Sequence, residues 1–209
     1  MPVLDQIAYY QNRRDEAPNQ ELAHRLVETR DRAGIQEIAE NVWNKNTNIQ
    51  SDCVKTLYEI GYQDPPLIAP YAGDFLKLLH SRHNRLVWGA MLALSTIADI
   101  AADSIDPQRA DIQRAMEQGS VITVDAGVLT LAKLAATSDE RRREIFPYLL
   151  QHLQTCRPKD VPQHAEKIAI AVDASNKDPF IRTLEQRLPN MSASQAARIK
   201  RVIKQVEKV

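Results

Sequence analysis

Apolar residues recur along the chain at i, i+3, i+4 and i+7 in stretches of roughly 11 to 20 residues, which is the spacing of one face of an α-helix. Segments rich in proline, glycine and capping residues separate these stretches. They lie at residues 44–48, 63–66, 80–84, 104–108, 117–120, 137–140, 157–162, 176–179 and 189–194. Residues 120–127 come nearest to a strand, but their β-branched side chains lead directly into a helical pattern. The pattern therefore predicts an all-α fold.

A motif of the form small-x-x-small-Leu-x-x-Ile occurs three times with a constant spacing of 37 residues. The copies are CVKTLYEI (53–60), AMLALSTI (90–97) and GVLTLAKL (127–134), and weaker copies follow at 165–172 and 195–202. A fixed period of this length is typical of repeat proteins, in which stacked units bury a continuous core. We therefore expect a helical repeat array.

The motif has a packing role. Its small residues allow two helices to cross at close range, and the leucine and isoleucine one turn on fill the layer between repeats. We expect the following positions to be buried: Leu57, Ile60, Ala90, Leu94, Ile97, Leu131 and Leu134. A further helix precedes each copy, and two of these helices are predicted to bend around an internal proline, Pro70 and Pro147.

These features resemble HEAT repeats, which pair a first helix containing proline with a second helix carrying this motif. Ile49, Leu86 and Thr123 occupy the aliphatic position four residues before each copy. The resemblance covers roughly residues 34–209, and we interpret residues 1–33 as an N-terminal capping pair. It implies an α-α superhelix, a HEAT/armadillo-like solenoid of about five helix pairs, which forms a single domain over residues 1–209.

Composition narrows the function classes. With 27 basic and 27 acidic residues the net charge is zero, so we expect no nucleic-acid partner. Two distant cysteines and no secretory signal at the N-terminus predict reduced thiols and a cytoplasmic location. The most apolar stretch, residues 84–98, contains Ser95 and Thr96 and is shorter than the roughly 18 to 20 apolar residues of a membrane span. We expect no membrane insertion.

The repeat register predicts a binding surface. It aligns Ser51, Trp88, Asp125 and Gln163, one from each of four successive second helices. Equivalent positions of a solenoid line up along its concave face, which suits a protein or peptide partner. Trp88 is the kind of large aromatic anchor that dominates such surfaces. In the alternative interpretation, Trp88 packs between helices as part of the core.

Polar residues flank this row. Arg85 stands near the start of one second helix, and another such helix start carries Lys159, Asp160, Gln163, His164 and Lys167. Free backbone N–H groups at a helix start favour anions, so we add these residues to the candidate partner-binding set. The simpler interpretation is a rigid, proline-capped turn with Asp160 as the N-cap.

A metal site is a further option at this turn. His152 and Cys156 are one helical turn apart and His164 follows after a loop, which suits part of a zinc site. A fourth ligand is not evident, unless His80 or His83 reaches the site. We adopt the simpler interpretation, in which the cysteine packs as a small apolar residue and both histidines are solvated. We therefore expect no metal and no cofactor.

No phosphate-binding loop, metalloprotease motif or nucleophile motif is present, so we predict no catalytic residue. The predicted function is a non-enzymatic protein–protein interaction scaffold. The alternative is a HEAT-like DNA-repair glycosylase acting on alkylated bases, which needs a cationic groove, aromatic side chains and a carboxylate. Trp43, Trp88 and Asp125 are its candidates, but the zero net charge and 5% aromatic content favour the scaffold.

Overall fold

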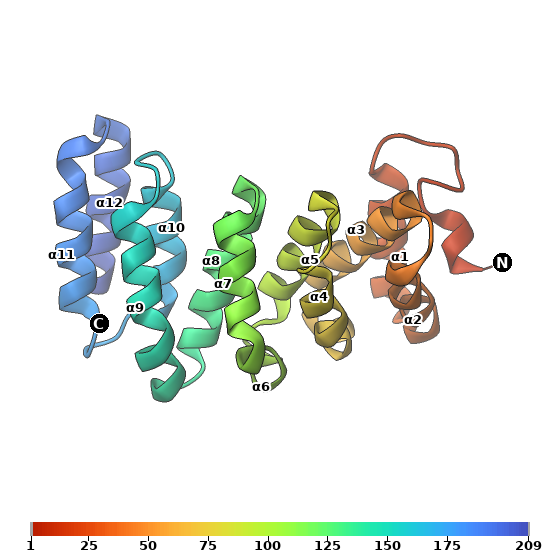
Figure 1. The fold of residues 1–209 in the computed structure, drawn as a ribbon, viewed down its shortest axis with the longest axis horizontal. Helices are drawn as coiled ribbons and strands as arrows, with labels where there is room; N and C mark the ends of the chain where they lie inside the picture. The colour runs from red at the N-terminus through yellow and green to blue at the C-terminus, as the bar shows by residue number, and fades with distance from the viewer. Residues whose placement is uncertain (1, 209) are drawn as a thin grey trace. The chain divides into compact units, whose positions relative to one another are not determined.

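The computed structural model describes residues 2–208, and every regular element among them is helical (Figure 1). The predicted all-α fold is confirmed. Residues 121–136 form one continuous helix, although their first residues are β-branched. The chain forms two compact units. Unit 1 extends to Gly127, and unit 2 begins at Val128.

Unit 1 contains α1 (Ala17–Thr29), α2 (Arg32–Glu40), α3 (Thr47–Gln63), α4 (Ala72–Leu78), α5 (Asn84–Ile97), α6 (Ala102–Ile105) and α7 (Arg109–Gln118). Short 3₁₀ turns accompany them: η1 (Val3–Gln6), η2 (Asn41–Trp43), η3 (Pro65–Leu67), η4 (Ala69–Tyr71) and η5 (Asp106–Gln108). Helix α8 (Val121–Ala136) begins in unit 1 and ends in unit 2. Unit 2 continues with α9 (Asp139–Thr155), α10 (Val161–Ile168), η6 (Ala169–Ala171), α11 (Lys177–Arg187), η7 (Leu188–Asn190) and α12 (Ala193–Val206).

Helix α3 is the centre of unit 1, because it packs against both α1 and α5. Helix α2 packs on α3, and α4 packs on α5, so each first helix lies against the second helix that follows it (Figure 1). The segment predicted to form a capping pair, residues 1–33, contains η1, α1 and the first residues of α2. Helix pairs are thus the building unit, as the repeat pattern predicts.

The repeated motif forms the core. Leu57, Ile60, Ala90, Leu94, Ile97, Leu131 and Leu134 are all fully buried, as predicted. Close helix approach explains the small residue directly before the motif on α5, Gly89. A Cβ atom on Gly89 of α5 would lie 2.5 Å from Cγ1 of Val54 in α3, far inside van der Waals contact. Only glycine lets these two helices pack at this distance.

Of the two prolines predicted to lie inside helices, only one does so. Pro147 lies inside α9, as predicted. The prediction for Pro70 is wrong, because this residue lies in η4, before α4 begins. Pro65, Pro66 and Pro70 remove three backbone N–H donors within six residues, so the chain forms two 3₁₀ turns there instead of a helix.

In unit 2, α9 packs with α11 and α10 packs with α12 (Figure 1). Helix α12 begins with a capping box, in which Ser192 and Gln195 satisfy each other's backbone N–H groups. It buries Ile199, Val202 and Val206 on one face. None of the helices described between residues 2 and 208 combines the length and apolar character that a membrane crossing requires.

Candidate functional site

The residues predicted to contact a partner fall in both units. Ser51, Arg85, Trp88 and Asp125 belong to unit 1, and Lys159, Asp160, Gln163, His164 and Lys167 belong to unit 2. The unit 1 residues surround a pocket and a group of aromatic side chains on α3 and α5. The unit 2 residues lie at the turn from α9 into α10.

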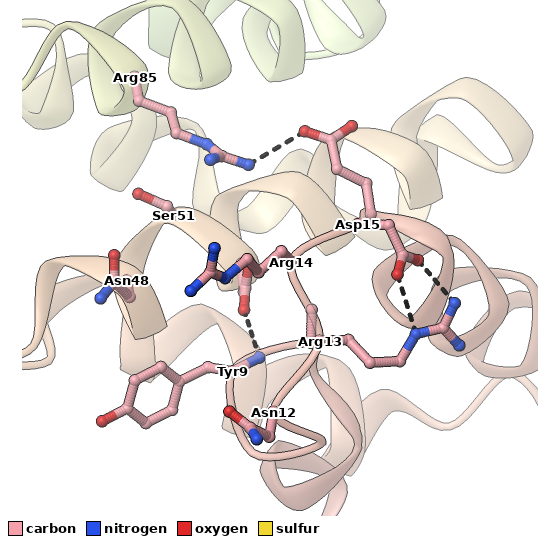
Figure 2. A pocket seen from close by; sticks show the side chains of 11 residues that line it. Tyr9, Asn12, Arg13, Arg14, Asp15, Asn48, Ser51 and Arg85 are labelled. Carbon is pink, nitrogen blue, oxygen red and sulfur yellow. Dashed lines mark hydrogen bonds and ion pairs between the residues drawn. The ribbon is translucent and has the colours of Figure 1, made fainter.

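The N-terminal pocket of unit 1 has a volume of about 380 Å³ and is open to solvent (Figure 2). The loop before α1 forms one wall, and the first turns of α3 and α5 form the other. Its lining residues are Ala8, Tyr9, Asn12, Arg13, Arg14, Asp15, Glu16, Asn48, Ser51, Asp52 and Arg85. Two predicted residues, Ser51 and Arg85, therefore lie at one site, whereas the loop residues were not predicted.

Buried hydrogen bonds fix the loop in place. Asp52 of α3 accepts hydrogen bonds from the Tyr9 backbone N–H at 2.8 Å and from the side-chain amide of Asn19 at 3.0 Å. Asn19 is fully buried and accepts from the Ala8 backbone N–H at 2.9 Å. Asn12 turns the loop with a φ of 53°, a conformation that asparagine tolerates better than most residues. These contacts make the pocket a pre-formed feature.

An ion-pair network around the buried Lys55 connects the N-terminal loop, α3 and α5. Lys55, whose side chain is 7% exposed, contacts Glu16 at 2.9 Å and Glu59 at 2.6 Å. The other oxygen of Glu16 accepts from Arg85 at 3.0 Å. Burial alone would lower the pKa of Lys55, but its hydrogen bonds to Glu59 and Glu16 outweigh burial and raise it. Lys55 is therefore a fixed positive charge, and Arg85 is held by Glu16.

The two neighbouring arginines of the loop differ in their partners. Arg13 is paired with Asp15 through two hydrogen bonds, of 2.8 and 3.0 Å. Arg14 is exposed and makes no hydrogen bond or ion pair with any residue from 2 to 208. Figure 2 shows its side chain reaching toward Ser51 and Asn48, whereas Arg13 points away toward Asp15. The pocket thus presents one guanidinium group, that of Arg14, which makes no ion pair with a described residue.

An aromatic row, consisting of Tyr58, Tyr62 and Trp88, lies further along α3 and α5, with Trp88 about one helical turn beyond Arg85. The Tyr58 ring centroid is 5.8 Å from that of Tyr62 and 6.2 Å from that of Trp88. The Lys55 ammonium lies 4.8 Å from the centroid of the Tyr58 ring. Trp88 is half-buried, and Tyr62 is 54% exposed. Burial raises the pKa of both tyrosines, so the row is uncharged at neutral pH.

Two predicted residues of unit 1 offer less to a partner. The Ser51 hydroxyl donates to the Thr47 carbonyl of its own helix at 2.8 Å, and the residue is 8% exposed. Asp125 of α8 is half-buried, and its charge contributes to the raised pKa of Tyr62. Asp125 thus lies close enough to the aromatic row to influence it electrostatically.

At the α9–α10 turn, Lys159 and Gln163 are exposed, whereas Asp160 and Lys167 are half-buried. Asp160 precedes α10 but makes no side-chain capping hydrogen bond, because its carboxylate contacts Arg157 at 2.6 Å. The expectation that His164 is solvated is wrong. It is 4% exposed, since α10 turns this residue inward toward α9.

The inward turn brings His164 to His152. Their Nδ1 and Nε2 atoms are 2.9 Å apart, and the Sγ atom of Cys156 lies within 4.8 Å of both. Burial, together with His164, lowers the pKa of His152 to about 4. Burial also raises the pKa of the Cys156 thiol to about 11. These three side chains form a compact cluster.

A second pocket in unit 1 was not predicted. Its volume is about 470 Å³, and its lining residues are Trp43, Asn44, Lys45, Thr47, Gln50, Lys77, Leu78, His80, Ser81, His83 and Leu86. His80 contacts Asp111 at 3.3 Å, and the Trp43 indole N–H donates to Asp74. The clustering of histidine, lysine and asparagine in the turns at 44–48 and 80–84 is the sequence signal for this pocket.

Known structures with similar folds identify the class of the protein. An engineered protein from the Northeast Structural Genomics Consortium aligns over 100% of this chain and 98% of its own, with a TM-score of 0.70 and 16% identity. A designed armadillo repeat protein in complex with the peptide (KR)4 covers 88% of this chain and 86% of its own, with a TM-score of 0.66 and 12% identity. A structure of computationally designed armadillo repeat proteins for modular peptide recognition covers 88% of this chain and 85% of its own, with a TM-score of 0.68 and 13% identity.

The protein therefore has an armadillo/HEAT-like repeat fold, as the sequence resemblance implied. Neither a known protein family nor a curated protein matches the sequence. The similarity consequently defines the fold alone.

Proposed function

We propose that this protein is a non-enzymatic scaffold that binds an extended peptide on unit 1. The peptide lies across the N-terminal pocket and the aromatic row. Arg85, Trp88 and Asp125 contribute to this surface, and Ser51 lines the pocket. The exposed residues of the α9–α10 turn, Lys159 and Gln163, with Lys167 beside them, serve as further partner contacts on unit 2.

The observation that carries the proposal is the Arg14 guanidinium in a pre-formed pocket, where it makes no ion pair with a described residue. A guanidinium group binds a carboxylate through two parallel hydrogen bonds, which gives both affinity and orientation. The neighbouring Arg13 and Arg85 are already occupied by Asp15 and Glu16. A glutamate or aspartate side chain of a peptide is therefore the group that Arg14 receives.

The remaining surface fits the rest of a peptide. The side-chain amides of Asn12 and Asn48 make no hydrogen bond with residues 2–208, and each can both donate to and accept from a peptide backbone. Trp88 and Tyr62 supply partly exposed aromatic area for an aliphatic side chain, the kind of contact that dominates binding energy. A peptide that alternates acidic and aliphatic residues matches both the pocket with Arg14 and the aromatic row.

The designed armadillo repeat proteins support peptide binding as the role, because two of them are described by the peptides they recognise. One of these binds the basic peptide (KR)4. The charge preference proposed here is the opposite, because an unpaired arginine repels a basic peptide and attracts an acidic one.

The experiment is a binding titration followed by fluorescence anisotropy. Two labelled peptides of equal length are compared, one alternating leucine with glutamate and the other alternating leucine with lysine. We expect the glutamate peptide to bind and the lysine peptide to bind at least about tenfold more weakly, which corresponds to about 1.4 kcal/mol. Equal binding of both peptides, or binding of neither, contradicts the proposal.

Two pairs of variants locate the site. Arg14→Gln should weaken binding of the glutamate peptide about tenfold, because it removes a bidentate ion pair. Its matched control is the double variant Arg13→Gln/Asp15→Asn, which removes a pair of charges that already neutralise each other. Trp88→Ala should also weaken binding, whereas Trp43→Ala should not, since Trp43 belongs to the other pocket. If the double variant and Arg14→Gln have the same effect, the site is elsewhere.

The designed repeat proteins that the chain resembles give no support to the alternative function of base excision. This alternative is tested separately, by incubating the protein with alkylated duplex DNA and measuring the released base. Release that is abolished by Asp125→Asn would replace the scaffold proposal with a glycosylase.

A further inference from the structure

The cluster of His152, Cys156 and His164 in unit 2 has the composition of a metal site. His152 and Cys156 lie one turn apart at the end of α9, and His164 faces them from α10. One ligand atom from each residue lies within 4.8 Å of the other two. The two imidazole nitrogens are already in contact, at 2.9 Å. These side chains converge on one point although they come from two helices.

The surrounding backbone holds the cluster in place. The Cys156 N–H donates to the His152 carbonyl at 2.8 Å, which closes the last turn of α9. Arg187 of α11 donates to the carbonyls of Gln154 and Cys156. On the other side, Pro162 and His164 are both buried at the start of α10. Three helices therefore fix the positions of the side chains.

We infer that His152, Cys156 and His164 bind a divalent ion of the zinc class, with a remaining coordination position filled by water. Imidazole nitrogen and thiolate sulfur are the ligands that zinc prefers, at about 2.0–2.1 Å and 2.3 Å. Two nitrogens on a tetrahedral zinc ion are about 3.3 Å apart, close to the observed 2.9 Å. Binding requires a small separation of the two rings and an approach of the Cys156 sulfur toward them.

The protons of the three ligands rearrange when the ion binds. In the metal-free cluster one imidazole donates its N–H proton to the other, so one of the two facing nitrogens is protonated. On binding, this proton moves to the other nitrogen of the same ring, which leaves both facing nitrogens free to coordinate. Cys156 loses its thiol proton to solvent and coordinates as the thiolate. One proton is released for each ion bound.

One carboxylate and two guanidinium groups lie near the cluster, and they act on the Cys156 thiol with opposite sign. The carboxylate of Asp160 lies close enough to act on both His152 and Cys156, and it offsets the positive charge of the bound ion. Arg187 and Arg157 also act on Cys156, where they favour the thiolate. The Nε atom of Arg187 is buried and has no hydrogen-bond partner among the described residues. A thiolate at Cys156 supplies negative charge beside this guanidinium.

The N-terminal pocket and the aromatic row, which form the main peptide surface, lie in unit 1 and share no residue with this cluster. An ion here cross-links α9 and α10, so it is expected to stabilise unit 2. The remaining water position also leaves the ion accessible to a ligand of a partner, such as a carboxylate or an imidazole.

The test uses the full chain, stripped of metal with a chelator and then titrated with cobalt(II). A thiolate bound to tetrahedral cobalt gives an intense near-ultraviolet charge-transfer band together with visible bands. We expect these bands to saturate at one cobalt ion per chain and to disappear when zinc is added. We also expect zinc to raise the midpoint temperature of thermal unfolding. Absence of a charge-transfer band at saturating cobalt would overturn the inference.

The chain contains its own control for the cysteine. Cys156→Ser should remove the charge-transfer band and the thermal shift, whereas Cys53→Ala should retain both, because Cys53 is buried in unit 1. His152→Gln is preferred to substitution of the more buried His164 and should weaken zinc binding at least about tenfold. Far-ultraviolet circular dichroism confirms that each variant is folded. Binding that survives both Cys156→Ser and His152→Gln places the metal elsewhere.

Discussion

The Oε2 atom of Glu16 lies 2.9 Å from the Nζ atom of Lys55, a lysine whose side chain is almost fully buried. This pair joins the end of the N-terminal loop to the middle of α3. Charged groups at such a depth require compensation, and Glu16 shares this role with Glu59. The N-terminal pocket thus depends on an ionic contact as well as on apolar packing.

Glu16→Gln should lower the free energy of unfolding by about 1–2 kcal/mol, because it leaves Lys55 with a single carboxylate partner. The loss of stability is smaller than for a fully buried ion pair, since Glu16 is 42% exposed. Urea denaturation measures the change. Asp15→Asn is the matched control, because its pair with Arg13 lies on the surface, and it should cost clearly less than Glu16→Gln. Equal costs for the two variants would show that burial of Lys55 does not depend on Glu16.

Gly89→Ala should destabilise the protein by about 1–3 kcal/mol, because the added methyl group clashes with Val54 across the α3–α5 contact. Val54→Ala removes the clashing atom, so the double variant should recover part of that loss. The double-mutant cycle is measured by chemical denaturation and should give a favourable coupling. Gly73→Ala is the control, since a Cβ there meets nothing within 4 Å. Additive effects of the two substitutions would mean that the helices move apart freely.

Leu94→Ala should cost about 2–5 kcal/mol, because Leu94 is fully buried at the centre of the repeated motif. The neighbouring Leu92 is half-buried, and Leu92→Ala should cost clearly less. Denaturation midpoints of the two variants provide the comparison. A larger loss for Leu92→Ala would place the core on the other face of α5.

Glu166 and Arg198 link α10 to α12 through two hydrogen bonds, of 2.5 and 2.9 Å. The bond to Arg198 lowers the pKa of Glu166 below its ordinary value of 4.5. The stabilisation is therefore complete above that value and is lost as the pH falls through the folded-state pKa. Because both groups are exposed, Glu166→Gln should cost less than about 1 kcal/mol at pH 7. Urea denaturation at acidic pH should show no remaining difference from the unsubstituted chain.

The helical elements and the core could be predicted because their signals are local or periodic. Leu57, Leu94 and Leu131 recur every 37 residues, and all three are buried. The error at Pro70 has a local origin as well. Pro65 and Pro66 lie shortly before Pro70. With these three prolines the chain forms a pair of 3₁₀ turns instead of the bent helix that we predicted.

The candidate sites were only partly predictable, because they depend on contacts between distant parts of the chain. The pocket requires the loop at residues 8–16 to reach Asp52 on α3, and no sequence pattern specifies this contact. The repeat register selects Ser51 and Trp88, and Arg85 flanks that row at a helix start. Ser51 and Arg85 line the pocket, and Trp88 belongs to the aromatic row. The spacing of His152 and Cys156 was visible, but burial of His164 depends on how α10 packs against α9.

Trp88 offers a direct readout of the proposed peptide surface. In a Trp43→Phe background the intrinsic tryptophan emission reports on Trp88 alone. Since Trp88 is half-buried against Tyr58, we expect an intermediate emission wavelength and partial quenching by iodide. The leucine–glutamate peptide should reduce that quenching, because an aliphatic side chain packed on the indole excludes iodide from it. A blue-shifted emission that iodide cannot quench would mean that Trp88 is part of the core, and the proposed surface would lose its aromatic anchor.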